Sequence, residues 1–81
     1  MTITVALFAA AREIVGSESI QLQLDDDATV ETVKQLLIDR FPELLPLVGV
    51  SSWSMDHEYV SPSEQLRDGA ELGFIPPVSG G

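Results

Sequence analysis

Apolar and polar residues alternate in two segments, one near each end of the chain, and this period of two predicts β-strands. The positions expected to face the core are Ile3, Val5 and Leu7 in residues 2–8, and Leu72 and Phe74 in residues 70–75. These are the most strongly apolar of the expected strands, so we place them side by side at the centre of one sheet. A connection that crosses over a helix would make such neighbours parallel.

The middle of the chain carries the long helical pattern. Thr29 is the expected N-cap, and Pro42 ends the helix because a proline disfavours helical geometry in the residue before it. Between them, apolar residues recur at helical spacing and are expected to form one stripe: Val30, Val33, Leu36, Leu37 and Phe41. We expect this whole stripe to pack in the core.

The other segments are shorter. They are expected to be a helical turn, a strand, a second helical turn and a hairpin, at residues 9–15, 19–24, 42–47 and 48–60. Gly16 would end the first turn, and Asp56 and His57 would make the hairpin turn. In the second turn, the residues expected to cover the edge of the core are Leu44, Leu45 and Leu47. One helix on one face of a mixed sheet is an α+β domain, which we expect to span residues 1–75.

The same alternation leaves large apolar side chains on the sheet face that the helix does not cover. Phe8 follows the inward-facing Leu7, and Ile75 follows the inward-facing Phe74, so both are expected to point outward. The parity of the hairpin strand leaves open whether Tyr59 joins them. Near the end of the last strand these residues would form an exposed patch, and such patches mark interaction sites.

The last six residues, 76–81, are expected to form a tail beyond the domain. Pro76 and Pro77 fix φ and favour an extended exit from the last strand, and the chain stops on Gly80 and Gly81. Two glycines can thread a channel too narrow for any Cβ. The reactive group that such a tail would deliver is the α-carboxylate of Gly81. The plain alternative is a frayed terminus.

Composition narrows the possible partners. The 81-residue chain has thirteen acidic and four basic residues and a net charge of −9. This charge disfavours nucleic acids and anionic membranes and favours partners with basic surfaces. The chain has no cysteine, which excludes thiolate chemistry, and we expect a cytoplasmic protein. The run Asp25-Asp26-Asp27 lacks the spacing of a calcium loop, so we expect no metal site. The single histidine, His57, lacks the Ser and Asp partners of a catalytic triad.

Two stretches resemble the small subunit of molybdopterin synthase, the MoaD family. The first is Leu7-Phe8-Ala9-Ala10-Ala11-Arg12-Glu13-Ile14-Val15-Gly16. The second runs from Asp68 to Gly81 and ends in Pro-Pro-Val-Ser-Gly-Gly. The length matches too, so the resemblance covers the whole chain. It implies a ubiquitin-like β-grasp fold, with one main helix packed on one face of a mixed sheet. The departures are Asp56, where the family commonly has Asn, and the atypical residues 48–55.

The resemblance implies a sulfur carrier subunit that is not an enzyme on its own and binds no cofactor. An adenylating enzyme similar to ubiquitin E1 would use ATP to activate the carboxylate of Gly81, which would then become a thiocarboxylate. The tail would enter the active site of the synthase large subunit and give its sulfur to a pterin precursor, building the dithiolene of molybdopterin. The residues expected to thread that site are Pro76, Pro77, Val78, Ser79 and Gly80. Those assigned to the partner-binding patch are Phe8, Tyr59, Ile75 and Arg12.

Three other functions stay open. The chain could be a sulfur carrier for thiamine or cysteine synthesis, although the Pro-Pro-Val-Ser neck argues against this. It could be a protein modifier that is conjugated to lysines through Gly81. It could also be a β-grasp interaction domain without a reactive terminus, for which Gly81 would be dispensable.

Overall fold

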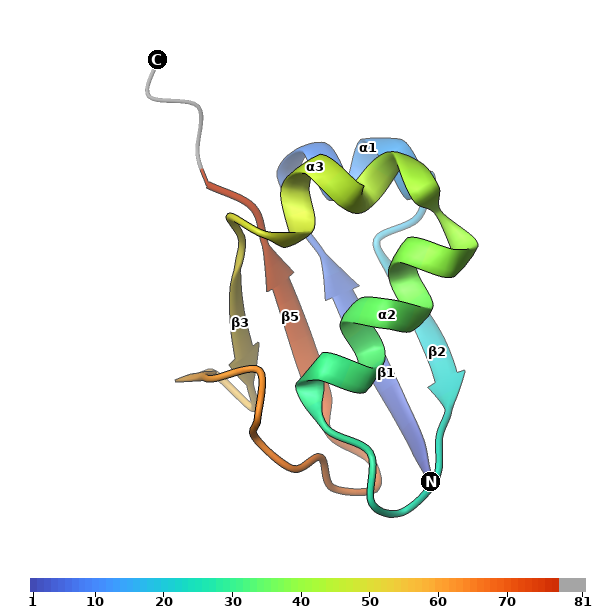
Figure 1. Cartoon of the computed structure of the whole chain (residues 1–81), viewed down its shortest axis with the longest axis vertical. Helices are drawn as coiled ribbons and strands as arrows, with labels where there is room; N and C mark the ends of the chain where they lie inside the picture. The colour runs from blue at the N-terminus through green and yellow to red at the C-terminus, as the bar shows by residue number, and fades with distance from the viewer. Residues whose placement is uncertain (78–81) are drawn as a thin grey trace.

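Five strands form one mixed sheet in the order β2-β1-β5-β3-β4 (Figure 1). The structure is a computed structural model and describes residues 1–77. The strands are β1 (Thr2–Leu7), β2 (Ser19–Gln23), β3 (Ser52–Met55), β4 (Glu58–Val60) and β5 (Glu71–Ile75). β1 and β5 are parallel neighbours at the centre, as the sequence predicts, and the other neighbouring strands are antiparallel.

The helical elements cover one face and one end of this sheet. They are α1 (Ala9–Val15), α2 (Val30–Arg40), the 3-10 turn η1 (Pro42–Leu44) and α3 (Leu45–Val48). α2 crosses one face, while α1 and α3 lie at the end where β1 and β5 finish (Figure 1). α1 ends as predicted at Gly16, whose φ of 81° is left-handed. Within residues 1–77, no helix has the length and apolar character needed to cross a membrane.

The core lies between α2 and the sheet. All five strand residues expected to face inward are buried: Ile3, Val5, Leu7, Leu72 and Phe74. Trp53 of β3 stacks on Phe74, with 4.7 Å between the ring centroids. On the helix side, the buried residues of α2 are Val30, Val33 and Leu37. The strongest apolar patterns of the sequence therefore do become the core.

The apolar stripe of α2 is narrower than predicted. Leu36 is 36% exposed and Phe41 is only partly buried. Leu36 lies on the flank of the helix, where it lines an open hollow instead of meeting the sheet. The expectation that the whole stripe packs in the core is therefore wrong at its edge.

The segment after α2 is helical for longer than expected. A strand was expected over residues 48–55, but β3 begins only at Ser52, because Val48 belongs to α3. Leu44 and Val48 are both buried and are four residues apart, which is the spacing of one helix face. Leu45, expected to cover the core edge, points away from that face and is 59% exposed.

Candidate functional site

The chain leaves the sheet at the end of β5, next to the end of β1. Leu7 pairs with Phe74 in the parallel register, so the residues that follow them, Phe8 and Ile75, come out at the same edge. Pro76 is buried and Pro77 is exposed. The remaining tail residues, Val78, Ser79, Gly80 and Gly81, lie outside the described residues. The tail therefore starts from this edge of the sheet, next to Phe8.

The strand register settles which face Tyr59 occupies. One row of paired residues runs across four strands, from Ala6 through Gly73 and Ser54 to Tyr59. This row is on the helix-free face, since its neighbours in sequence, such as Leu7 and Phe74, are buried on the other face. Tyr59 is 76% exposed and Phe8 is 47% exposed. Ile75 is partly buried.

The three side chains surround a shallow concavity, which we call the sheet hollow. It has a volume of about 240 Å³. The residues that line it are Ala6, Phe8, Ser54, His57, Tyr59, Glu71, Gly73 and Ile75. The structure thus brings together Phe8, Tyr59 and Ile75 of the expected patch. That this patch binds a partner stays a prediction.

Gly73 makes the floor of the sheet hollow possible. A Cβ at this position would lie 2.5 Å from Ser54 Oγ and 3.7 Å from both Phe8 Cε2 and Ile75 Cδ1. A separation of 2.5 Å is far inside van der Waals contact. A side chain at residue 73 would therefore displace the Ser54 hydroxyl, and its Cβ would lie in ordinary van der Waals contact with Phe8 and Ile75.

Arg12, the fourth residue assigned to the patch, is placed differently. It lies in α1 and makes an ion pair with Glu18, with 3.6 Å between Arg12 Nη1 and Glu18 Oε1. It is not one of the residues that line the sheet hollow. α1 turns away directly after Phe8, because Ala9 has a φ of 49°, a left-handed conformation that is uncommon for alanine.

The hairpin turn at Asp56 and His57 is bonded to the start of β5, next to the sheet hollow. Asp56 and His57 have φ values of 50° and 74°, so both are left-handed, as in a type I′ turn. Asp56 Oδ1 accepts the N–H of Glu71 at 3.1 Å, and Asp56 Oδ2 accepts from Arg67 Nη2 at 2.9 Å. An asparagine would offer the same Oδ1 acceptor but no ion pair. The departure at Asp56 therefore keeps the turn and adds a bond to Arg67.

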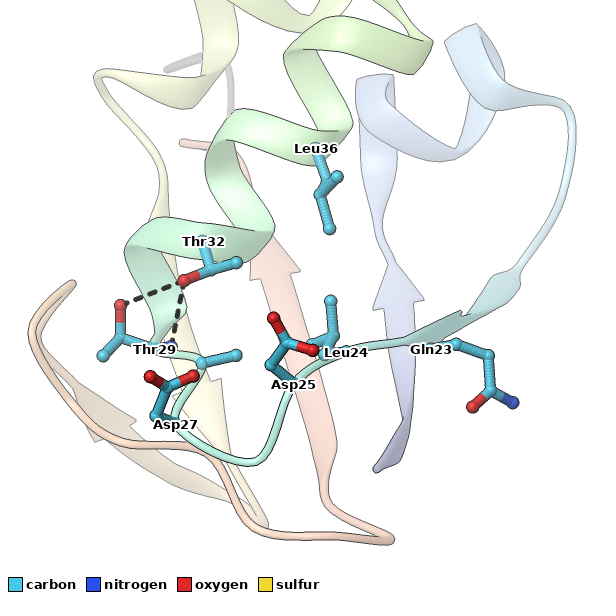
Figure 2. A pocket seen from close by; sticks show the side chains of 8 residues that line it. Gln23, Leu24, Asp25, Asp27, Thr29, Thr32 and Leu36 are labelled. Carbon is cyan, nitrogen blue, oxygen red and sulfur yellow. Dashed lines mark hydrogen bonds between the residues drawn. The ribbon is translucent and has the colours of Figure 1, made fainter.

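A second, larger hollow lies at the other end of the molecule, between the start of α2 and the segment after β2 (Figure 2). Its volume is about 660 Å³, and Leu24 and Leu36 face each other across it. Asp25 and Asp27 also line it. Within residues 1–77, no three His, Cys, Asp or Glu side chains gather closely enough to hold a metal ion. This hollow is remote from Ile75, where the tail begins.

The sequence missed five residues of the sheet hollow: Ala6, Ser54, His57, Glu71 and Gly73. Alternation within each segment does not show that these residues are neighbours, because they belong to three strands and a turn from different parts of the chain. The register of β3 on β5 is what brings Ser54 beside Gly73. A signal was present in the alternation of residues 71–75, where the small Gly73 interrupts an otherwise bulky outer face.

Comparison with known proteins gives a consistent family. The model of the ThiS family matches residues 5–81. The molybdopterin synthase sulfur carrier subunit of Chlamydomonas reinhardtii is 36% identical, with all of both chains covered. Small archaeal modifier protein 1 of Haloferax volcanii is 35% identical, over 93% of this chain and 95% of that protein.

Solved structures agree on the fold. The crystal structure of the Haloferax volcanii modifier superposes with a TM-score of 0.85 at 27% identity, covering 95% of this chain and 98% of that one. One chain of the complex between subunits 1 and 2 of the Helicobacter pylori molybdopterin-converting factor superposes with a TM-score of 0.72 at 21% identity, with both chains fully covered. A ubiquitin from Caldiarchaeum subterraneum gives 0.66 at 17% identity, over 100% and 98%. The ubiquitin-like β-grasp prediction is thus confirmed, and the chain belongs to the ThiS family, as a relative of molybdopterin synthase sulfur carrier subunits.

Proposed function

We propose that the chain is the sulfur carrier subunit of a molybdopterin synthase. The observation that carries this proposal is the full-length likeness to such a subunit, at 36% identity with neither chain extending beyond the other. A carrier of this kind needs a stable domain, a surface for its partners and a tail that reaches their active sites. The β-grasp domain, the exposed patch beside Ile75 and residues 76–81 match these three parts.

The chemistry of the proposal takes place on the carboxylate of Gly81. A carboxylate is a poor electrophile, so an E1-like enzyme first joins it to the AMP portion of ATP and releases pyrophosphate. A sulfur nucleophile then displaces AMP, which leaves a thiocarboxylate in place of the carboxylate. The proposal places the transferred sulfur on this terminus, and the chain has no cysteine that could carry it instead. ATP is consumed by the activating enzyme, and the carrier holds no cofactor of its own.

The large subunit of the synthase is the partner that we propose for the second stage. Support comes from the Helicobacter pylori complex, in which subunits 1 and 2 of the molybdopterin-converting factor are bound to each other and one chain shares this fold. The tail would enter the active site of the large subunit, and its sulfur would pass to a pterin precursor. Water would then cleave the bond between the Gly81 carbonyl carbon and the transferred sulfur, so that the small subunit returns with a carboxylate at Gly81 and is activated again.

Deleting Gly81 tests the proposal directly. We expect the truncated chain to fold normally but to gain no terminal sulfur and to support no molybdopterin synthesis, because its new terminal carboxylate, on Gly80, stops one residue short of the partner active sites. The measurement is the intact mass of each protein isolated from cells. The full chain should show the mass increase that results when sulfur replaces one terminal oxygen, and the truncated chain should not. Gly49→Ala is the matched control, since Gly49 has a φ of −72° and an added Cβ would meet nothing within 4 Å. Normal sulfur transfer by the truncated chain would refute the proposal.

Conjugation to proteins is the second candidate function. It is favoured by the 35% identity to an archaeal protein that is named a modifier. The two functions differ in their products, because conjugation joins Gly81 to a lysine of another protein and gives larger species under denaturing conditions. Such species, present for the full chain and absent after deletion of Gly81, would support conjugation.

Accumulation of a thiamine precursor on deletion of the gene would instead point to a carrier for thiamine synthesis.

A further inference from the structure

We propose that the sheet hollow is a socket for one large apolar side chain of the synthase large subunit, and that a lysine or arginine beside that side chain pairs with Glu71. This inference rests on the proposed function for the identity of the partner. An apolar patch could bind as a flat surface, whereas a socket demands a protruding anchor at one position.

The floor and the walls of the sheet hollow differ in the size of their residues. The floor consists of the small residues Ala6, Ser54 and Gly73, which are neighbours in one row of the sheet. The walls include the much larger Phe8, Tyr59 and Ile75. A Cβ on Gly73 would lie 3.7 Å from both Phe8 Cε2 and Ile75 Cδ1, so these two walls flank the space above the glycine at van der Waals distance. The patch is therefore concave at its centre.

The size of the sheet hollow suits a single side chain. Its volume is about 240 Å³. An apolar cavity of about 150 Å³ is enough to hold a benzene molecule. One leucine, methionine or phenylalanine side chain can therefore enter, while a helix or a strand cannot. Interface anchors of this kind sit in desolvated pockets and carry most of the binding energy.

The rim of the sheet hollow selects a positive neighbour for this anchor. Glu71 is exposed, and within residues 1–77 its carboxylate makes no ion pair. The residues beside it in the sheet are Thr4 on β1 and the Asp56 turn, whose carboxylate is already bonded to Arg67. A partner cation is therefore the group that complements Glu71, in keeping with the net charge of −9.

Substitutions at Ser54 distinguish a socket from a flat patch. Ser54→Leu adds apolar surface but fills the socket, so we expect calorimetry to show about tenfold or more weaker binding to the large subunit. Ser54→Ala leaves the socket open and should bind like the wild type. Gln21→Leu is the matched control, because it adds the same side chain to the same sheet face outside the sheet hollow. Unchanged or stronger binding by Ser54→Leu would overturn the socket.

A second variant that adds a side-chain atom inside the socket keeps the test valid if Ser54→Leu does not fold. Gly73→Ala is made in the Ser54→Ala background, where the hydroxyl that would clash is absent. We expect it to unfold at nearly the same urea concentration as Ser54→Ala and to bind the large subunit more weakly. Equal binding by these two proteins would also count against the socket.

The charge at the rim is tested with a matched pair of acidic residues. Glu71→Gln should weaken binding several-fold and reduce its dependence on salt, because an ion pair is lost. Glu58→Gln removes the same charge from β4 outside the sheet hollow and should change binding much less. Equal effects of the two substitutions would refute the pairing with Glu71.

A titration without the large subunit separates the socket from the proposed function. We expect N-acetyl-Leu-Arg-amide to shift the amide NMR signals of Gly73 and Ser54 in the wild type but not in Ser54→Leu. N-acetyl-Leu-Glu-amide should bind more weakly. Peptide binding without binding of the large subunit would refute the proposed function and keep the socket. No shift of Gly73 or Ser54 up to the solubility limit of the peptide would refute the socket.

Discussion

Leu7 and Phe8 are consecutive residues with opposite environments. Leu7 is buried between the sheet and the helices, while nearly half of the Phe8 side chain is exposed on the helix-free face. Their sizes and hydrophobicities are similar, so the pleat of β1 and the turn at Ala9 decide which side chain serves the core. The structure thereby assigns Leu7 to the core, and our proposal assigns the adjacent Phe8 to the binding of partners.

Alanine substitutions at these two residues should separate stability from binding. We expect Leu7→Ala to lower the free energy of unfolding by about 2–5 kcal/mol, the usual range for a buried leucine. Phe8→Ala should lower it less, because its side chain is already partly in water, but should weaken both partner complexes about tenfold or more. Urea unfolding and titration calorimetry measure the two effects. If Phe8→Ala binds normally and unfolds as readily as Leu7→Ala, the assignment of Phe8 to a binding patch is wrong.

Among the elements, α2 shows how the start of a helix is fixed from two sides. Thr32 Oγ1 accepts the backbone N–H of Thr29 at 3.1 Å, and the two hydroxyl oxygens are 3.5 Å apart (Figure 2). The next two N–H groups, of Val30 and Glu31, are bonded by carbonyls of the 61–70 loop. Thr29 was expected as the N-cap, but the role of Thr32 was not. The loop and the threonine pair together satisfy donors that a helix leaves free at its start.

Removing one hydroxyl should reveal the contribution of the threonine pair. Thr32→Val keeps the shape of the side chain but leaves the Thr29 N–H without its acceptor, so we expect a loss of about 1 kcal/mol. Thr4→Val is the control, since Thr4 is also β-branched and lies on the helix-free face of β1. The measurement is the urea midpoint at constant slope, which reports stability alone. Equal midpoints for the two variants would mean that the pair contributes nothing.

At the scale of the whole molecule, the sheet places the tail and the patch at one edge. β1 and β5 are parallel, so Phe8 and Ile75 emerge together where residues 76–81 begin. The net charge of −9 gives the whole molecule a negative field, which favours basic partners over a distance that salt shortens. By our proposal, activation and sulfur transfer both need the same tail and the same patch.

The activating enzyme and the synthase large subunit should therefore compete for the chain. We expect each to displace the other from a fluorescently labelled carrier, because one tail cannot occupy two active sites. Raising the salt concentration should slow the association of the chain with both partners. Leu45→Ala is the control: it changes an exposed apolar residue outside the sheet hollow and should leave the affinity for both partners unchanged. Anisotropy titrations and sedimentation measure this. A stable complex that contains all three proteins would contradict the shared patch.

The sequence alone specified the parts of the fold whose signal is local. The alternation in residues 2–8 and 70–75 predicted the two central strands and their inward-facing residues, because side chains on a strand point to opposite faces in turn. The spacing from Val30 to Leu37 predicted α2, and Gly16 was recognised as a cap from its position after a helical segment. The outward direction of Phe8 and Ile75 followed from the same alternation.

The tertiary structure decided what depends on register between distant segments. Tyr59 could be placed only when β4 paired with β3, and the sheet hollow exists only because Ser54 lies beside Gly73. Leu45 and Leu36 were misjudged for a related reason, since burial is set by what packs against a residue and an apolar pattern does not name that neighbour. Local backbone geometry is encoded within a few residues, whereas a concave site is made by contacts between segments that only the folded sheet brings together.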